Sequence, residues 1–300
     1  MLGQQAPGRM GVGIISGGKV GSALGSALRS VGHQIVGVYA TSDASIERVE
    51  AMLPGVPILD VRSIVERSEL VILALPDDEL APLVEGLAKL GAWQPGQIVV
   101  HTAGRYGASV LEPARRAGAL GIALHPAMTF TGTSLDVARL QGCPFAVSAP
   151  AALLPIGQAL ATEMGGEPVV IAEADRAAYH FALSHGANHA VTLISQAMRV
   201  LEQLGVAEPG AFLRPLVEAS VEGALRSGES LLTGPIVRGD AGTVAAHHAI
   251  AQELAAENPQ LEDVPPTYEA LAQATADRAH SRGVLGDAQF EEISRAISGN

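Results

Sequence analysis

A glycine-rich turn close to the N-terminus has the residue types that hold phosphate groups. It follows an apolar run and precedes a stretch of small residues typical of a helix. Its Gly18 allows the backbone to approach a pyrophosphate, and its Gly21 allows the helix to pack closely on the strand before it. The free N–H groups at the helix N-terminus then face the phosphates. This pattern predicts a dinucleotide site, with a turn that binds no ligand as the alternative, and the site comprises Ser16, Gly17, Gly18, Lys19, Val20 and Gly21.

Ser16 stands where such a turn ordinarily has its first glycine. A residue with a side chain fits there without strain only if its φ angle is negative. We therefore expect Ser16 to keep a negative φ angle, and we expect Gly17 to adopt the strained backbone conformation instead.

The end of the second predicted strand indicates which dinucleotide binds. A site for NAD places an acidic residue there, which holds the 2′-hydroxyl of the ribose. This strand is followed instead by Thr41 and Ser42. Their hydroxyls can accommodate a 2′-phosphate, whereas a carboxylate would repel it. Asp43 comes next, and we expect it to cap the following helix. Together with the charge of Lys19, the pattern favours NADP over NAD as the cofactor.

Three polar residues on a helix after the last predicted strand have the types needed for acid–base chemistry. His180, Ser184 and Asn188 follow one another at intervals of four, so they span about 80° of a regular α-helix. An imidazole can donate a proton near neutral pH, which makes His180 the candidate acid and Asn188 the residue that orients the ligand. The alternative is a set of hydrogen bonds within a helical core or a dimer interface.

Lysine is rare in this chain. It occurs only at positions 19 and 89, so no lysine follows residue 89. Many dehydrogenases that join a Rossmann domain to a helical domain carry a catalytic lysine four residues before an asparagine. Ser184 stands at that position here, four residues before Asn188, so the chemistry must use another proton donor.

Polar residues also follow other predicted strands, at the edge where parallel sheets bind their ligands. His125 ends one of these strands and is a second candidate acid. In the C-terminal part, Arg238 precedes a helix and can bind a substrate carboxylate through two hydrogen bonds, with His247 near the same cleft. The alternative is a structural turn that Arg238 and Asp240 stabilise. The expected cofactor contacts at strand ends are Leu75, Pro76, Asp77, His101 and Thr102.

His185 and His189 have the i, i+4 spacing of a metal-binding pair. Gly186 stands where the general-base glutamate of H-E-x-x-H would be, and a third ligand would have to come from His247 or His248. We therefore expect no metal site, and we expect two histidines at a surface or an interface.

Short apolar runs alternate with helical patterns between residues 10 and 172, which is typical of a parallel sheet covered on both faces. After Asp175 the pattern is helical throughout, and Asp175 and Asp240 stand where helix caps belong. The predicted fold is a doubly wound, mainly parallel Rossmann-like sheet at 10–172, followed by an all-helical substrate and dimerisation domain at 173–300. The predicted strands are 11–16, 34–40, 69–75, 97–102, 119–124, 144–148 and 168–172; the predicted helices are 18–31, 43–52, 77–90, 107–117, 150–164, 175–204, 209–227, 240–257, 265–281 and 287–298.

The composition narrows the classes of partner. The chain has 300 residues, 48% of them hydrophobic, and a net charge of −12, which argues against nucleic acids and anionic membranes as partners. Cys143 is its one cysteine, so an internal disulfide is excluded and a reducing cytoplasm is expected. No apolar run reaches the length of a membrane span.

Several motifs resemble one family over nearly the full length of the chain: the proteins that join a Rossmann-like domain to domain of unknown function 2520. The most specific motif is TGPIVRGD, and one departure is HTAG, where we associate HTSG with the family, so that Ala103 replaces a serine. The matching segments are GKVG (18–21), ALPDDEL (74–80), HTAG (101–104), LHPAMTF (124–130), YH and NH (179–180 and 188–189) and LTGPIVRGD (232–240).

The resemblance implies relationship to ketopantoate reductases, pyrroline-carboxylate reductases and deazaflavin-dependent NADP reductases. By analogy with folds of this arrangement, which commonly bury their helical domains against each other, we also expect a homodimer through the helical domain. With the residues above, it predicts an NADP(H)-dependent oxidoreductase that transfers a hydride to or from a small carboxylate-bearing 2-oxo acid or imine, with a ketopantoate-like substrate among the candidates. The alternatives are an NADP-binding sensor or partner module without catalysis, and a deazaflavin-dependent NADP reductase.

Overall fold

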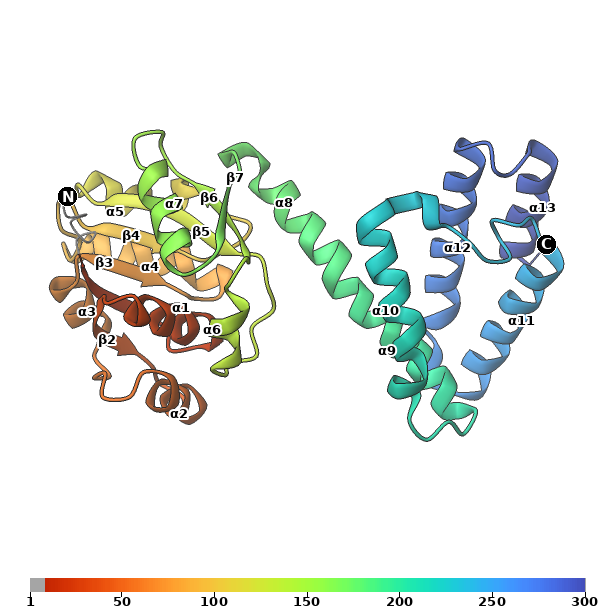
Figure 1. Ribbon diagram of the computed structural model, residues 1–300, viewed down its shortest axis with the longest axis horizontal. Helices are drawn as coiled ribbons and strands as arrows, with labels where there is room; N and C mark the ends of the chain where they lie inside the picture. Colours follow the sequence, from red (N-terminus) through yellow and green to blue (C-terminus); the bar gives the residue numbers. More distant parts are fainter. Residues whose placement is uncertain (1–8, 300) are drawn as a thin grey trace, which may run out of the picture. The chain divides into compact units, whose positions relative to one another are not determined.

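The computed structural model describes residues 9–299 of the chain (Figure 1). Its contacts separate two compact units, and the division falls between Ser184 and His185. The first unit contains every strand of the described residues, and the second contains only helices.

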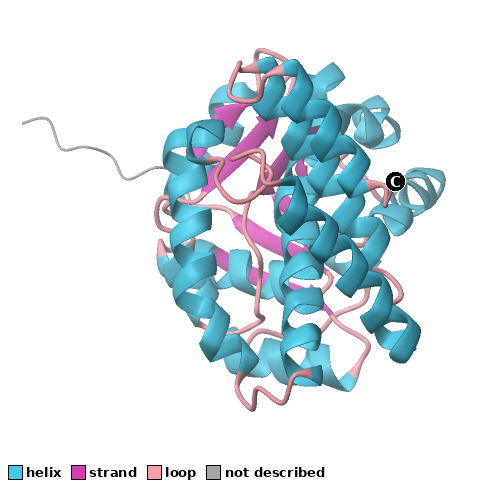
Figure 2. Ribbon diagram, turned by 90° about the vertical axis from the view of Figure 1, so that its right-hand side faces the viewer, coloured by secondary structure: helices cyan, strands magenta, loops and turns pink. Residues whose placement is uncertain are grey.

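The first unit is built on one sheet of seven strands in the order β2-β1-β3-β4-β5-β6-β7. Figure 2 draws strands in magenta and helices in cyan. All neighbouring strands are parallel except β5 and β6, which are antiparallel. This confirms the predicted doubly wound, mainly parallel Rossmann-like sheet. The strands are β1 (Gly11–Ile15), β2 (Gln34–Tyr39), β3 (Leu70–Leu73), β4 (Ile98–His101), β5 (Leu120–Pro126), β6 (Pro144–Ser148) and β7 (Glu167–Val170).

Helices cover both faces of this sheet. Ile14 and Ile72 belong to one apolar cluster and their neighbours Ile15 and Leu73 to another, because successive side chains of a strand point to opposite faces. This is why the strands are apolar without interruption. The first cluster includes side chains of α1 (Lys19–Ser30), α2 (Asp43–Met52) and α7 (Leu154–Glu163), and the second includes those of α3 (Val61–Arg67), α4 (Asp77–Lys89) and α5 (Glu112–Arg116).

Two short helices of this unit were not predicted. They are α3, of seven residues, and α6 (Leu135–Arg139), of five. Neither is long enough to show a helical period in its sequence. The helix predicted at 107–117 is a 3₁₀ turn, Ala108–Leu111, that continues into α5.

The second unit has a small apolar core formed where three of its helices pack, with Val244, Ala276 and Ile293 fully buried. Asp240 caps the helix that follows it, as predicted, and its Oδ1 accepts a hydrogen bond from the N–H of Thr243 at 3.0 Å. Across residues 9–299, no helix has both the length and the apolar character that crossing a membrane requires. The helices of the second unit are α9 (His189–Gln203), α10 (Pro209–Ser227), α11 (Ala241–Glu257), α12 (Val264–Ser281) and α13 (Asp287–Ile297).

The regular helix predicted at 175–204 is wrong in one respect. It consists of α8 (Arg176–Leu183), a π-helical turn at Ser184–Asn188, and α9. The wider π turn changes the angle per residue, so the 80° stripe expected for a regular helix does not apply through it. Asp175 stands at the N-cap position of α8, but its side chain makes no capping hydrogen bond.

Candidate functional site

The glycine loop joins β1 to α1 at the carboxyl edge of the sheet. A Cβ atom on Gly21 would lie 2.1 Å from the carbonyl oxygen of Ser16, so only glycine allows α1 to approach the strand this closely. A Cβ atom on Gly18 would meet a single described protein atom within 4 Å, the Oγ of Ser16 at 3.3 Å. The protein itself therefore requires the glycine at position 21, whereas the glycine at position 18 leaves space for a ligand.

The expectation for the backbone of Ser16 is wrong. Ser16 has a φ angle of 87°, and it is the one residue other than glycine with a positive φ angle among residues 9–299. Gly17 is not among the glycines with positive φ, and its N–H donates to the carbonyl oxygen of Tyr39 at 2.8 Å. The reversal of the chain after β1 requires the left-handed conformation at position 16, which costs a residue with a side chain about 1–2 kcal/mol.

Two cations lie beside the glycine loop, and the sequence analysis found only one of them. Arg48 of α2 points its Nη1 toward the carbonyl oxygen of Gly17, 3.5 Å away. A Cβ atom on Gly132, in the loop after β5, would lie 2.7 Å from Nε of Arg48 and 2.9 Å from Cγ of Lys19. Neither cation forms an ion pair with an acidic residue in the described part of the chain. The position of Arg48 in the sequence of α2 does not indicate that its side chain contacts the glycine loop.

Residues 41–43, which follow β2, are exposed, and α2 begins among them. Thr41 is exposed at the strand end. Ser42 is the N-cap of α2, and its Oγ accepts a hydrogen bond from the N–H of Ser45 at 3.3 Å. Asp43 is the first helical residue rather than the cap, so that expectation is wrong. A serine hydroxyl bonds the backbone two or three residues on as readily as a carboxylate does, and here it takes the cap position.

Two imidazoles meet over Gly104. His125 lies near the end of β5, and His180 lies on α8. A Cβ atom on Gly104 would lie 3.1 Å from Nε2 of His125 and 2.6 Å from Cδ2 of His180. The Nδ1 of His125 lies 2.8 Å from the hydroxyl of Tyr179. The structure therefore brings together both candidate acids, and it adds a tyrosine that the sequence analysis did not assign to the site.

Arg176, at the start of α8, fixes this helix to the sheet. Its side chain is buried and donates hydrogen bonds to the hydroxyl of Ser148 (2.7 Å) and to the carbonyl oxygens of Ala123 (3.1 Å), Ala146 (2.9 Å) and Gly104 (3.5 Å). Sequence reasoning missed this residue, because an arginine at the start of a helix ordinarily lies in solvent.

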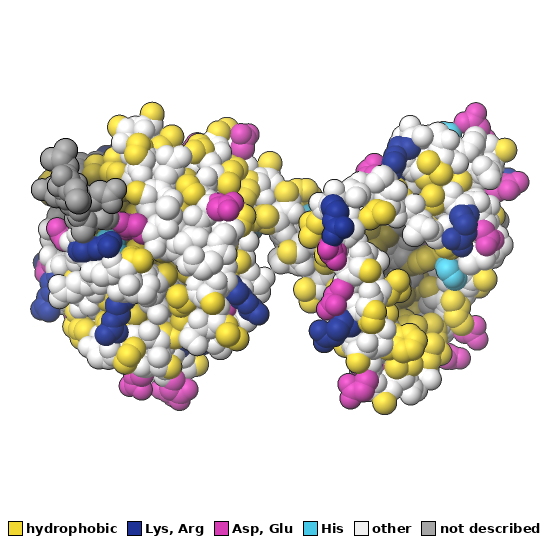
Figure 3. All heavy atoms as spheres, viewed as in Figure 1, with side chains coloured by type: hydrophobic (Ala, Val, Ile, Leu, Met, Phe, Trp, Pro, Cys, Tyr) yellow, Lys and Arg dark blue, Asp and Glu magenta, His cyan; other side chains and the backbone are white. Residues whose placement is uncertain are grey.

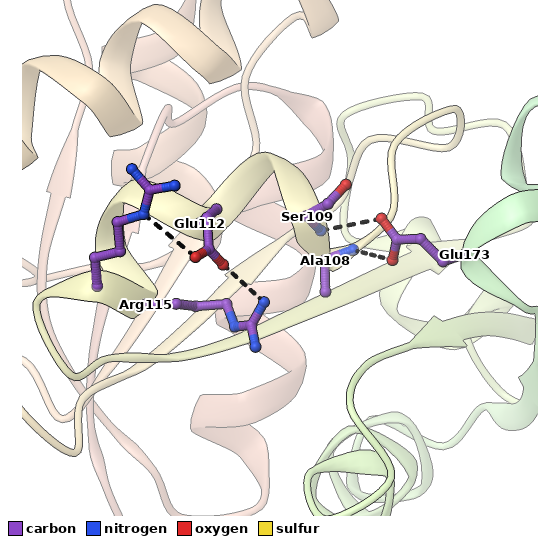
Figure 4. Close-up of polar contacts among 6 residues, drawn as sticks. Ala108, Ser109, Glu112, Arg115 and Glu173 are labelled. Carbon is purple, nitrogen blue, oxygen red and sulfur yellow. Dashed lines mark hydrogen bonds and ion pairs between the residues drawn. The ribbon is translucent and has the colours of Figure 1, made fainter.

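Glu173 provides a second attachment just before α8. Its carboxylate accepts hydrogen bonds from the N–H groups of Ala108 at 2.8 Å and Ser109 at 3.0 Å (Figure 4). Burial opposes the charge, but these hydrogen bonds and Arg176 hold the pKa of Glu173 below its usual value. The charged carboxylate therefore ties the start of α8 to the loop after β4.

The histidines at the ends of β4 and β5 are uncharged at neutral pH. Burial lowers the pKa of His125 to about 4, and the positive charge of Arg176 adds to this effect. Burial likewise lowers the pKa of His101 to about 4. The Nε2 of His101 lies 2.9 Å from the carbonyl oxygen of Gly107, and its Nδ1 is buried without a hydrogen-bond partner among the described residues.

The other predicted strand-end residues also lie along this edge. Pro76 is the N-cap of α4, and Asp77 is its first residue, with Oδ2 3.9 Å from Nε of Arg105. Thr102 follows β4, and its N–H donates to the carbonyl oxygen of Leu73 at 3.1 Å. Leu75 follows β3 and is partly buried.

The remaining predicted residues belong to the π turn or to the second unit. Ser184 and Asn188 are the first and last residues of the π turn. Arg238 and His247 are exposed, and both lie near Asp240. Hydrogen bonds from Thr243 lower the pKa of the Asp240 carboxyl most, and the charges of Arg238 and His247 lower it further.

His185 and His189 lie side by side, with their Nδ1 atoms 3.0 Å apart. They border a hollow of about 610 Å³ between α9 and α12. Within residues 9–299, no group of three histidine, cysteine or acidic side chains is arranged to hold a metal ion.

Comparison with known proteins agrees with this fold. A search of curated proteins found no match. Three similar solved structures are a Bacteroides fragilis protein provisionally described as an NADP oxidoreductase (20% identity, TM-score 0.72, 89% of this chain and 98% of that chain), an imine reductase from Myxococcus stipitatus in complex with NADP⁺ (19%, 0.60, 94% and 99%) and a pyrroline-5-carboxylate reductase from Coxiella burnetii (16%, 0.52, 91% and 98%). At these identities the likeness shows the fold alone.

Two family models match successive parts of the chain. Residues 2–126 match the Rossmann-like domain, and residues 143–275 match domain of unknown function 2520. Together they span most of the chain, in the order that its motifs predict. The chain therefore belongs to the family of proteins that join a Rossmann-like domain to domain of unknown function 2520.

Proposed function

We propose that the chain is an NADP(H)-dependent oxidoreductase that transfers a hydride to or from a small carboxylate-bearing 2-oxo acid or imine. The observation that carries this proposal is the meeting of His125 and His180 at the same sheet edge as the glycine loop. Ligands of doubly wound sheets bind at that edge. When bound, the dinucleotide supplies or accepts the hydride, and the protein supplies orientation, a proton and complementary charge.

The residues that would hold the dinucleotide fit it chemically. The open space at Gly18 admits a pyrophosphate, and the N-terminus of the twelve-residue helix α1 faces it. The predicted contacts are Ser16, Gly17, Gly18, Lys19, Val20, Gly21, Thr41, Ser42, Leu75, Pro76, Asp77, His101 and Thr102, to which we add Arg48.

NADP is the proposed form of the cofactor. No acidic residue stands between Tyr39 and Ser42, where a carboxylate would hold a ribose 2′-hydroxyl. Arg48 and Lys19 bring two positive charges to the same region, and neither has an acidic partner within residues 9–299. A guanidinium can bind a phosphate through two hydrogen bonds. The NADP⁺ complex of the similar imine reductase is consistent with this choice.

The proposed chemistry divides among a few side chains. His180 gives the proton to the reduced product, and Asn188 orients the substrate, with Ser184 beside it on the helix. Arg238 binds the substrate carboxylate, and His247 supports it. Residues 10–172 form the dinucleotide-binding domain in this proposal, and residues 173–300 form the substrate and dimerisation domain.

We further propose that the chain is a homodimer through its helical part. Large apolar side chains of α9 and α10 are exposed, among them Phe212 (67%), Leu216 (68%) and Leu225 (85%). Figure 3 shows apolar side chains gathered on this unit around a hollowed face. Contiguous exposed apolar surface of this kind is typical of an interface. A reducing cytoplasm remains the predicted compartment, because Cys143 is the one cysteine.

The test begins with fluorescence titrations of the purified chain with NADPH and NADH. Ketopantoate and a panel of small imines are then added at saturating cofactor. Tighter binding of NADPH, followed by its oxidation when substrate is added, supports the proposal. Binding without turnover contradicts catalysis and favours a sensor or a deazaflavin partner, and no binding of either nucleotide contradicts the site itself.

A pair of glycine variants makes the titration specific. Gly18→Val fills the space meant for the pyrophosphate, and the one described atom that its Cβ meets within 4 Å is the Oγ of Ser16, a small hydroxyl that can rotate away, so the variant should abolish binding and leave the fold intact. Gly86→Val adds the same side chain in α4, where a Cβ atom has no described atom within 4 Å apart from the backbone of its own helix, and should leave binding unchanged. Equal binding by both variants would contradict the proposed position of the dinucleotide.

A further inference from the structure

We propose that His125 is an uncharged N–H donor, held in one tautomer by Tyr179, that binds an oxygen atom of the substrate and does not act as an acid. This inference rests on the proposed reductase function and makes it more specific. It assigns Tyr179 as a positioning residue and favours oxo substrates over protonated imines.

The hydrogen bond between Tyr179 and His125 indicates which ring nitrogen of His125 carries the proton. The hydroxyl of Tyr179 and Nδ1 of His125 are 2.8 Å apart, and either atom can carry the proton. Within residues 9–299, the hydroxyl has no other partner. If Nδ1 carried the proton, the half-buried phenol O–H would have no acceptor among these described residues, which is costly. The O–H therefore donates to Nδ1, and the proton of the imidazole lies on Nε2.

The Nε2–H group faces the space above Gly104. A Cβ atom there would lie only 3.1 Å from Nε2, so any side chain at position 104 would cover the donor. The φ angle of Gly104 is not positive, so its backbone does not require glycine. Gly104 is thus needed for the space that it leaves beside the two imidazoles.

The surroundings of the ring disfavour a second proton. His125 is near Arg176, His180 and His101, and the charge of Arg176 disfavours any further positive charge. The negative charge of Glu173 acts on Arg176 and His101, and its carboxylate accepts hydrogen bonds from two backbone N–H groups. At neutral pH His125 can therefore donate a hydrogen bond but has no second proton to give.

These features fit the reduction of a carbonyl group. The carbonyl carbon gains a hydride from the reduced dinucleotide, the π electron pair moves to the oxygen, and the oxygen gains a proton from His180. His125 keeps its own proton and stabilises the charge that develops on the oxygen. A protonated imine has no lone pair for this donor, and Arg176 repels its charge.

Two substitutions of His125 separate a donor from an acid. In His125→Gln the amide nitrogen is as many bonds from the backbone as Nε2, whereas in His125→Asn it corresponds to Nδ1. We expect His125→Gln to keep kcat for a 2-oxo acid within about tenfold, and His125→Asn to lose about 100-fold or more. Equal losses in the two variants, with NADPH binding intact, would overturn the proposal.

The preference for oxo substrates over imines provides a second test of the proposal. The ratio of kcat/KM for a 2-oxo acid to that for a cyclic imine should fall at least tenfold in His125→Asn, because only the oxo substrate uses the donor. A ratio that does not change would contradict the substrate class. If neither substrate is turned over by the unaltered chain, the proposed function fails, and the tautomer is then decided by spectroscopy.

The ¹⁵N NMR signals of the His125 ring report the tautomer without any turnover. In the unaltered chain at pH 7 we expect a neutral ring with its proton on Nε2. In Tyr179→Phe the lost hydrogen bond should raise the pKa of His125, because that bond stabilises the neutral ring, and kcat should fall about fivefold with little change in KM. Tyr106→Phe, a control beside Arg105, should change neither. A charged ring, or a proton on Nδ1, would overturn the proposal.

Discussion

The carboxyl edge of the sheet has two regions of opposite character. Beside β1 and β2, Lys19 and Arg48 keep their charges without an acidic partner among the described residues. Beside β4 and β5, His101 is fully buried, His125 is partly buried, and both are uncharged at neutral pH. A phosphate is bound well by exposed charge, whereas a group that changes charge during a reaction is stabilised best by fixed neutral donors in a dry site.

The largest expected effect tests what holds α8 beside the histidine region. Arg176→Met removes a buried guanidinium and leaves the carbonyl groups of Ala123 and Ala146 without these partners. We expect the free energy of unfolding of the first unit to fall by about 3 kcal/mol or more. Trp93, buried in that unit, reports its unfolding in urea by fluorescence. The exposed Arg105→Met should cost under about 1 kcal/mol, and equal losses would contradict the role of Arg176.

The next effect concerns the charged region. Arg48→Gln should raise the Kd for NADPH about 10- to 100-fold and leave the Kd for NADH unchanged, because only NADPH carries the 2′-phosphate. Arg62→Gln on α3, which breaks an exposed ion pair with Glu66, should alter neither. If Arg48→Gln weakened both nucleotides equally, the arginine would be binding the pyrophosphate instead.

A pH titration sharpens the contrast between the two regions. The unfolded chain protonates its histidines near pH 6.5, whereas folded His101 and His125 stay neutral down to about pH 4. Because the unfolded state binds more protons in this window, the stabilisation is complete above pH 6.5 and is lost as the pH falls toward 4. The slope is at most about 1.4 kcal/mol per pH unit for each histidine.

Urea unfolding followed by Trp93 fluorescence between pH 7.5 and 4.5 measures this slope. His125→Gln should reduce it, because one of the two groups is gone. His185→Gln, at an exposed position in the second unit, should leave it unchanged. An identical slope in His125→Gln would mean that His125 does not stay neutral in the folded chain.

Much of the fold of the first unit could be predicted, because short segments of its sequence show which elements they form. Strands buried on both faces are continuous apolar runs, and His101 and His125 follow from the rule that strand ends carry ligand groups. α3 and α6 could not be predicted, because five to seven residues show no period.

The residues that were missed depend on tertiary contacts. Arg48, Arg176 and Tyr179 all lie on helices, and nothing in their spacing indicates which neighbouring strand or loop they contact. Arg176 in particular has a residue type that is rarely buried. The π turn at Ser184–Asn188 has likewise no signature in an alanine-rich helical sequence.

The smallest expected effect addresses the strain at Ser16. Ser16→Gly relieves a left-handed conformation that costs a side chain about 1–2 kcal/mol, against about 0.5–1 kcal/mol for the greater freedom of glycine in the unfolded chain. We expect a net gain of about 0.5–1 kcal/mol, seen as a higher Tm. Ser134→Gly, at a φ angle of −60°, should instead destabilise the chain.

The same variant tests why a serine is kept there. The Oγ of Ser16 lies 3.3 Å from the Cβ position of Gly18, where the pyrophosphate is expected, so its hydroxyl can donate to a phosphate oxygen. Ser16→Gly should therefore be more stable yet bind NADPH about threefold to tenfold more weakly, which corresponds to a single hydrogen bond. A variant that gained stability without losing affinity would show that the strain serves no ligand. The charged region would then owe its affinity to Lys19, Arg48 and the backbone alone.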